Sequence, residues 1–126
     1  MEKILNHING NAFPAESGEW LSCFEPAKGK VYAHIADSDK TDVEKAVKAA
    51  ESAFPTWSAL AVSARSVHMM KLAELMERDL DKLAAAESKD NGKPLKLATI
   101  VDIPRAISNI RSVSYTHLTL PTTPYV

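Results

Sequence analysis

The sequence predicts an α/β fold in which N-terminal β-hairpins are followed by three helices. Three observations carry this prediction. Turn-forming residues punctuate the N-terminal quarter of the chain, residues typical of helix starts and ends bound the segments that follow, and the apolar residues of those segments recur at helical spacing. The 126 residues, of which 45% are hydrophobic, are enough for one small domain.

Two turns define the expected hairpins. Asn9-Gly10 is the dipeptide that best fits both left-handed positions of a two-residue hairpin turn, so residues 5–15 are expected to form a hairpin. In Pro26-Ala27-Lys28-Gly29, proline fixes φ early in the turn and glycine accepts a positive φ near its end. Residues 31–35 then alternate Val, Ala and Ile with Tyr and His, which is the period of a half-buried strand.

The first helix is expected to begin at Thr41, because Thr41-Asp-Val-Glu44 has the pattern of a capping box. Its apolar stripe ends at Pro55, which predicts the end of the helix, with Trp57 in a short connector. The longer helix that follows is apolar over a wide sector and the strands are small, so we expect an exposed apolar face on this chain when it stands alone.

A second and longer helix is expected from about Ser63 to Asp90. Gly92 supplies a left-handed helix end, and Pro94 follows just beyond it. A third helical stretch is expected from about Leu95 or Ala98, with Pro104 tolerable in a first turn or at a kink.

Composition and charge exclude several classes of function. Fifteen basic and 16 acidic residues give a net charge of −1, which offers no field for nucleic acid or an anionic membrane surface. The single cysteine excludes an internal disulfide and a multi-cysteine zinc site, and it suits a reducing compartment. No apolar run approaches the ~18 residues of a membrane span, and the first residues lack the apolar core of a signal peptide. We therefore expect a cytoplasmic protein.

Candidate chemistry in the chain is sparse. Cys23 has no Gly-rich or helix-start context to lower the pKa of its thiol, so an inert, partly buried cysteine is expected. No two histidines have the i, i+4 spacing of a zinc helix, and the four glycines form no phosphate-binding loop. The residues alone predict no catalytic residue and no cofactor-binding residue.

The densest run, Glu87-Ser-Lys-Asp-Asn-Gly-Lys-Pro94, resembles the E-[ST]-x-D-x-G-K-P segment of the NAD(P)-dependent aldehyde dehydrogenases. Three further segments resemble landmarks of that superfamily in the same order: Ile8–Gly10 its opening hairpin, Glu25–Val31 its N-P-A-T-G-E-V turn, and Asp42–Trp57 its first helix. The resemblance covers about residues 5–111. Within the superfamily, residues 86–106 look most like the 2-aminomuconic and 2-hydroxymuconic semialdehyde dehydrogenases.

The resemblance implies that the chain is an incomplete piece of the aldehyde dehydrogenase fold. The parent would be a cytosolic homo-oligomer that oxidises an aldehyde, with NAD or NADP as cofactor, a cysteine thiolate as nucleophile and a glutamate that activates water. The family's P-W-N segment, Gly-rich turn, E-L-G-G general base and catalytic cysteine have no counterpart here, so the chain alone is expected to be inactive and to bind no cofactor. Cys23 matches none of these positions.

One family feature is expected to persist, a weak monovalent-cation site. The resemblance points to the Asp102 carboxylate, with the carbonyls of Cys23 and Phe24 as further donors. The alternative for Asp102 is a purely structural one, a helix-start cap before Pro104.

The composition changes abruptly after Ser112, from helix-forming residues to Thr, Pro and Tyr. Val113–Thr122 resembles one reading frame of the adapter DNA used in transposase-based sequencing. We therefore divide the sequence into residues 1–112, the truncated aldehyde dehydrogenase part, and residues 113–126, a non-native read-through tail. Two alternatives remain open: the tail is a natural extension, or the chain is a complete, small, non-enzymatic α/β interaction module.

Overall fold

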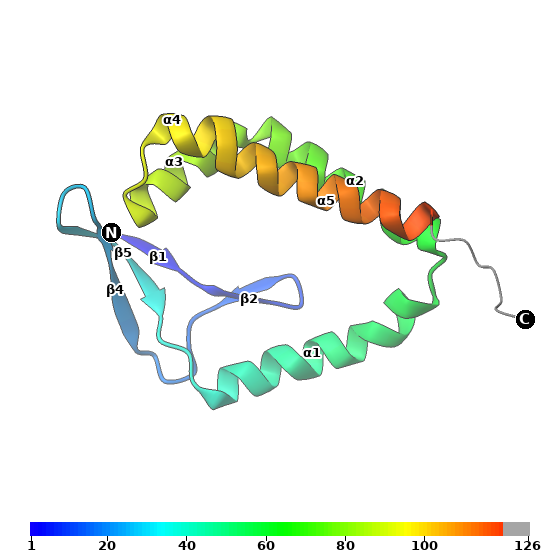
Figure 1. The fold of residues 1–126 in the computed structure, drawn as a ribbon. Coiled ribbons are helices and arrows are strands. Elements are labelled where there is room, and N and C mark those ends of the chain that lie inside the picture. The colour runs from blue at the N-terminus through cyan, green and yellow to red at the C-terminus, as the bar shows by residue number, and fades with distance from the viewer. Residues whose placement is uncertain (120–126) are drawn as a thin grey trace, which may run out of the picture. The chain divides into compact units, whose positions relative to one another are not determined.

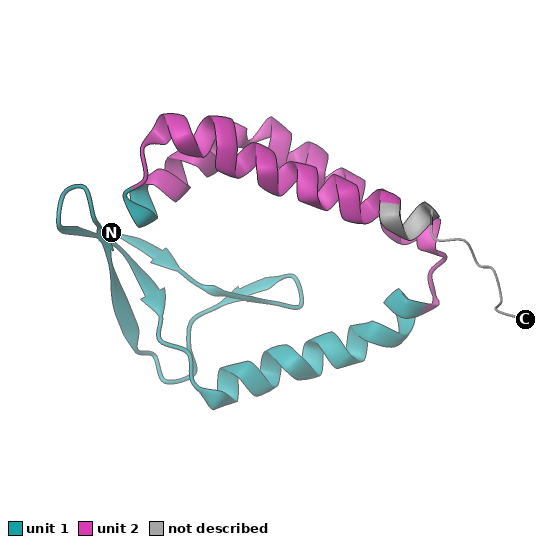
Figure 2. Ribbon diagram, in the orientation of Figure 1, with its two compact units in different colours: residues 1–58, 89–92 teal, residues 59–88, 93–126 magenta. Residues whose placement is uncertain are grey.

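The computed structural model describes residues 1–119, with side chains to residue 115. The chain divides into two compact units (Figure 2), residues 1–58 with 89–92 and residues 59–88 with 93–126. The end of the predicted tail, residues 120–126, lies outside the described residues. The described part contains both strands and helices, which confirms the α/β fold class.

The first unit contains a three-stranded sheet of order β1-β5-β4 (Figure 1). Strand β4 (Trp20–Glu25) pairs antiparallel with β5 (Lys30–Ala36), which confirms the hairpin expected around residues 26–29. Strand β1 (Glu2–Ile4) pairs parallel with β5 and was not expected, because three residues without a flanking turn signal carry no pattern.

A separate two-stranded sheet follows the expected first hairpin. Strands β2 (Asn6–Ile8) and β3 (Asn11–Phe13) pair antiparallel, with His7 opposite Ala12. The two turn residues have positive φ, 50° at Asn9 and 77° at Gly10. Both left-handed positions are therefore filled as the sequence predicts.

Helix α1 (Lys40–Ala59) begins with a capping box, but not the predicted one. The Asp39 carboxylate accepts from the Thr41 amide at 2.7 Å and the Asp42 amide at 3.4 Å, and the Asp42 carboxylate accepts from the Asp39 amide at 3.1 Å. The box is thus Asp39–Asp42, and the prediction of Thr41–Glu44 was wrong. Aspartate is a stronger N-cap residue than threonine, which favours the earlier start.

The same helix continues through Pro55, so the predicted end there was also wrong, and Trp57 is helical. Proline lacks the N–H that would bond to the carbonyl four residues earlier, and its ring crowds that carbonyl, so a proline inside a helix is costly but does not always end it. The Ser58 hydroxyl donates to the Pro55 carbonyl at 3.2 Å. The apolar stripe is largely uncovered: Val43, Val47 and Phe54 are 58%, 49% and 65% exposed. The expectation of an exposed apolar face concerned the longer helical segment that follows, where Val67 and Leu72 are 67% and 44% exposed, and it is confirmed.

The predicted long helix is two helices, α2 (Val62–Arg78) and α3 (Leu80–Asn91), which belong to the second unit up to Ser88. They are separated at Asp79, which has φ −100° and ψ 19°. The Asp79 carboxylate accepts two hydrogen bonds from the Arg78 guanidinium, at 2.7 and 3.2 Å. Backbone hydrogen bonds nevertheless continue across this position, since the Asp79 amide donates to the Leu75 carbonyl and the Leu83 amide donates to the Asp79 carbonyl, each at 3.0 Å. The apolar periodicity carried no sign of the break.

The last helical stretch has three parts. A short α4 (Leu95–Leu97) leads into a π-helical turn, η1 (Ala98–Asp102), and then α5 (Ile103–Thr119). Pro104 lies in the first turn of α5, as expected. Helices α2 and α5 lie side by side (Figure 1), and the Ser66 hydroxyl donates to the carbonyl of Ser114, which is 1% exposed. Helix α5 therefore continues past residue 112, where the composition changes.

Candidate functional site

Asp102, the predicted cation ligand, ends the π-helical turn and pairs with Lys93. The Lys93 ammonium donates to the Asp102 carboxylate at 2.7 Å, and the two side chains are 32% and 24% exposed. Asp102 is flanked by helical residues on both sides, so the alternative role of a helix-start cap was wrong. A cation at Asp102 would have to share this carboxylate with the Lys93 ammonium, whose positive charge opposes a second cation there.

The two other predicted donors lie next to each other on β4. Their strand has an irregularity between Cys23 and Phe24, since Cys23 pairs with Ala33 and Phe24 pairs with Val31. Both residues belong to the first unit, whereas Asp102 belongs to the second. The cation site stays a prediction. Among the described residues there is no group of three or more His, Cys, Asp or Glu that could hold a metal ion.

The best-formed polar cluster lies elsewhere in the first unit, where the end of α3 meets β5. The Tyr32 hydroxyl donates to the Asp90 carboxylate at 2.7 Å, and the Lys89 ammonium lies 4.6 Å from the centroid of the Tyr32 ring. The hydrogen bond to Asp90 raises the pKa of Tyr32 to about 12, with smaller contributions from burial and from the Asp90 charge.

Gly92 belongs to the same cluster. It has φ +77°, and a Cβ atom placed on it would lie 3.0 Å from the Cβ of Pro26. Sequence reasoning found Gly92 as a helix end but missed its contact with Pro26 and the bond between Tyr32 and Asp90. The two partners of that bond are 58 positions apart, and no local pattern links them.

A hollow of about 540 Å³ lies beside the β2–β3 hairpin, also in the first unit. Its polar lining is already engaged: the buried Asp42 carboxylate accepts from the Glu16 amide at 3.0 Å, and the Glu16 carboxylate pairs with Lys45. The other lining residues are mostly apolar or amide side chains: Ile8, Asn9, Asn11, Phe13, Pro14 and Ala15. The hollow presents no group suited to acid–base or nucleophilic chemistry.

The chain's glycines do not fit a dinucleotide. They lie at positions 10, 18, 29 and 92, each in a different part of the sequence. A phosphate-binding loop needs several glycines within a few residues, so that backbone N–H groups can approach the phosphate. Within residues 1–119, no helix is both long enough and apolar enough to cross a membrane.

A sequence model of the Aldehyde dehydrogenase family matches residues 13–121. This match covers most of the chain, and the chain therefore belongs to the aldehyde dehydrogenase family. The four segments from which the resemblance was drawn are consistent with that membership, and the structure matches an N-terminal piece of the family's fold.

Similar proteins support the same placement. The chain is 45% identical over 108 residues to the 2-aminomuconic semialdehyde dehydrogenase of Bos taurus, covering 86% of this chain and 22% of that protein. It is 40% identical over 106 residues to an aldehyde dehydrogenase of Deinococcus radiodurans, covering 84% of this chain and 21% of the relative. The NAD+ complex of an aldehyde dehydrogenase from Bacillus cereus matches with a TM-score of 0.92 and 32% identity, covering 99% of this chain and 26% of that one.

The chain thus spans about a fifth of the length of the curated relatives that it matches. The family match reaches residue 121 and so extends into the segment 113–126, for which the composition predicted a different origin. The division at residue 112 and the adapter origin of the tail stay predictions.

Proposed function

We propose that this chain is the N-terminal part of an enzyme that oxidises an aldehyde to the carboxylate with NAD or NADP. The match of the family to residues 13–121 is the observation that supports this most directly. Solved relatives described as NAD+ complexes agree with the proposed cofactor. Because the chain corresponds to about a fifth of its relatives, the activity belongs to the parent protein, and the chain alone is inactive.

What the chain contributes to the parent is scaffold. Several of its polar groups, including Asp39, Asp42 and Lys93, are engaged in capping or an ion pair. The apolar stripe of α1 is exposed at Val43, Val47 and Phe54. An apolar stripe of this kind is normally buried against another element. In the parent, downstream parts of the polypeptide would cover it.

The proposed substrate is a muconic semialdehyde. This is supported by the resemblance of residues 86–106 to that branch and by the 45% identity to the bovine 2-aminomuconic enzyme, against 36% to a betaine aldehyde dehydrogenase of Vibrio vulnificus. A full-length parent should give a higher kcat/KM with 2-aminomuconic semialdehyde than with betaine aldehyde. The opposite preference would refute the proposed substrate and leave the aldehyde-oxidising activity intact.

The parent is also proposed to be a cytoplasmic homo-oligomer that binds neither nucleic acid nor membrane.

The decisive experiment is to sequence the source DNA outward from a primer within the codons for Glu87–Pro94, past the codon for Ser112. A frame that continues into a P-W-N segment, an E-L-G-G motif and a nucleophilic cysteine supports both the parent enzyme and the adapter origin of the tail. Genomic DNA that encodes the Thr/Pro-rich tail followed by a stop codon would instead support the small interaction module.

The proposed inactivity has its own test. Isothermal titration of NAD+ into the purified 126-residue chain is expected to show no saturable binding, and aldehyde-dependent NADH formation is expected to stay at background. A saturable isotherm would contradict the assignment of the cofactor site to the missing part of the parent.

A further inference from the structure

The last three residues of α3, together with Gly92 directly after them, belong to a different unit from the rest of that helix. Residues 89–92 group with the N-terminal sheet, and the remainder of α3 groups with the other helices (Figure 2). Three separate interactions involve this segment: the Tyr32–Asp90 hydrogen bond, the Lys89 ammonium on the Tyr32 ring, and the packing of Gly92 on Pro26.

We propose that Lys89, Asp90 and Gly92 form a clasp that fastens the end of α3 to the β4–β5 hairpin through Tyr32 and Pro26. This holding role accounts for three residues of the run Glu87–Pro94. The inference stands independently of the parent's reaction, because it rests only on contacts within the first unit.

Gly92 meets two requirements at once. Its φ of +77° is costly for any residue with a Cβ atom, and that atom would also lie 3.0 Å from Pro26 Cβ and 3.4 Å from Pro26 Cγ. The other three glycines also have positive φ, yet a Cβ on any of them would meet nothing within 4 Å. A helix end alone explains the φ. The close approach to Pro26 explains the second requirement, which is that position 92 carries no Cβ atom.

Tyr32 is held from two sides. Its hydroxyl donates to a carboxylate, a charge-assisted hydrogen bond of the stronger kind, and an ammonium lies over its ring within cation–π range. Asp90 and Lys89 are exposed and Tyr32 is half-buried, so solvent weakens each interaction. The helix end is therefore held by three contacts, two on the Tyr32 side chain and one between Gly92 and Pro26. A single exposed pair would not hold it.

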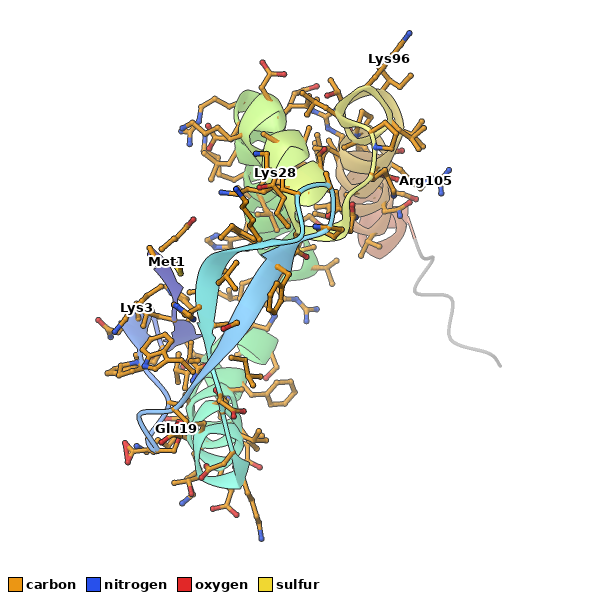
Figure 3. The ribbon with its side chains drawn as sticks, turned by 90° about the vertical axis from the view of Figure 1, so that its left-hand side faces the viewer. Met1, Lys3, Glu19, Lys28, Lys96 and Arg105 are labelled. Atoms are coloured by element: carbon orange, nitrogen blue, oxygen red, sulfur yellow. The ribbon has the colours of Figure 1, made fainter. Side chains whose placement is uncertain are left out.

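The receiving turn is preformed. The Glu25 carbonyl accepts from the amides of Lys28 and Gly29, at 3.1 and 2.8 Å, and the Glu25 carboxylate pairs with the Lys28 ammonium at 3.0 Å. Lys28 marks this turn in Figure 3. Pro26 is rigid in φ, so the turn offers the helix end a fixed apolar contact.

The first test is a spectrophotometric titration of tyrosine in the full 126-residue chain, comparing wild type with Asp90→Asn. In wild type, one tyrosine is expected to ionise about two pH units late, near pH 12 instead of 10.0, and Tyr32→Phe should remove that late step. Asp90→Asn should move it back toward pH 10. Asp81→Asn, a matched change at an exposed position of the same helix, should leave it in place.

The second test is done at neutral pH and measures the local stability of the helix end directly. Amide hydrogen exchange of Lys89–Asn91 is expected to become about tenfold faster in Asp90→Asn and in Tyr32→Phe, since each removes a charge-assisted hydrogen bond. Asp81→Asn should not change it. Unaltered exchange in both clasp variants, or a late tyrosine step that survives Asp90→Asn, would overturn the proposal.

Discussion

Gly10 and Gly92 have the same backbone conformation, φ +77°, in two very different surroundings. Around Gly10, in the β2–β3 turn, a Cβ atom would meet nothing within 4 Å, whereas at Gly92 it would meet Pro26 at 3.0 Å. Both glycines are required by local geometry, but only Gly92 is required by a neighbour that is distant in sequence. The open turn is a purely local structure, and the turn after α3 is also a tertiary contact.

The largest difference between the two turns should appear on substitution by alanine. Gly10→Ala introduces a Cβ at positive φ in open space and is expected to cost about 1–2 kcal/mol of local stability. Gly92→Ala adds the overpacking against Pro26 and is expected to cost about 2–4 kcal/mol. Native-state amide hydrogen exchange measures each cost locally, at the β2–β3 amides for Gly10 and at the end of α3 for Gly92. Equal costs would show that the contact with Pro26 is unimportant.

A double-mutant cycle isolates that contact from the φ requirement. Pro26→Gly removes both proline atoms that a Cβ at position 92 would meet, so Gly92→Ala should be about 1–2 kcal/mol less costly in the Pro26→Gly background. The measurement is the same exchange experiment on the single and double variants. The matched control combines Gly10→Ala with Pro26→Gly. The free-energy costs of these two substitutions should add.

The difference between the two turns also marks what the sequence could reveal. Asn9-Gly10 predicted the hairpin, and Gly92 with Pro94 predicted a helix end, because both signals act through the backbone of adjacent residues. The position of the capping box was misjudged, since Thr41 and Asp39 both fit a local pattern and only the relative strength of the caps separates them. The break at Asp79, where φ is −100° and ψ is 19°, was missed because the apolar periodicity continues across it.

The candidate site was less predictable than the fold. Asp102 was singled out by resemblance, and its pairing with Lys93 became visible only in the structure. Tyr32 was noticed only as a member of an alternating strand, although its hydroxyl finds Asp90. Contacts between residues far apart in sequence require the fold itself, and no alternation or capping pattern contains them.

A smaller effect is expected within the open turn itself. Asn9 is the one non-glycine residue with positive φ among the described residues, at 50°, and asparagine tolerates this region better than other residues. Asn9→Ala should cost about 1 kcal/mol, and Asn9→Gly should cost little or nothing. Exchange of the β2–β3 amides measures both, and the helix-end amides of Lys89–Asn91 should not respond to either.

A last effect concerns alkaline pH and separates the clasp from the open turn. The pKa of Tyr32 is raised from 10.0 to about 12 in the folded chain, chiefly because its neutral hydroxyl donates to Asp90. A raised folded-state pKa stabilises the protein fully below pH 10, and this stabilisation is lost as the pH rises through 12. The stability difference between wild type and Tyr32→Phe at the helix end should therefore be constant up to about pH 10 and shrink between pH 10 and 12. Using this difference cancels the ionisation of the other groups that both proteins share. The β2–β3 hairpin contains no tyrosine, so the hydrogen exchange of its amides should not differ between the two proteins at any pH. A difference there would mean that Tyr32 acts on the whole first unit and not through the clasp.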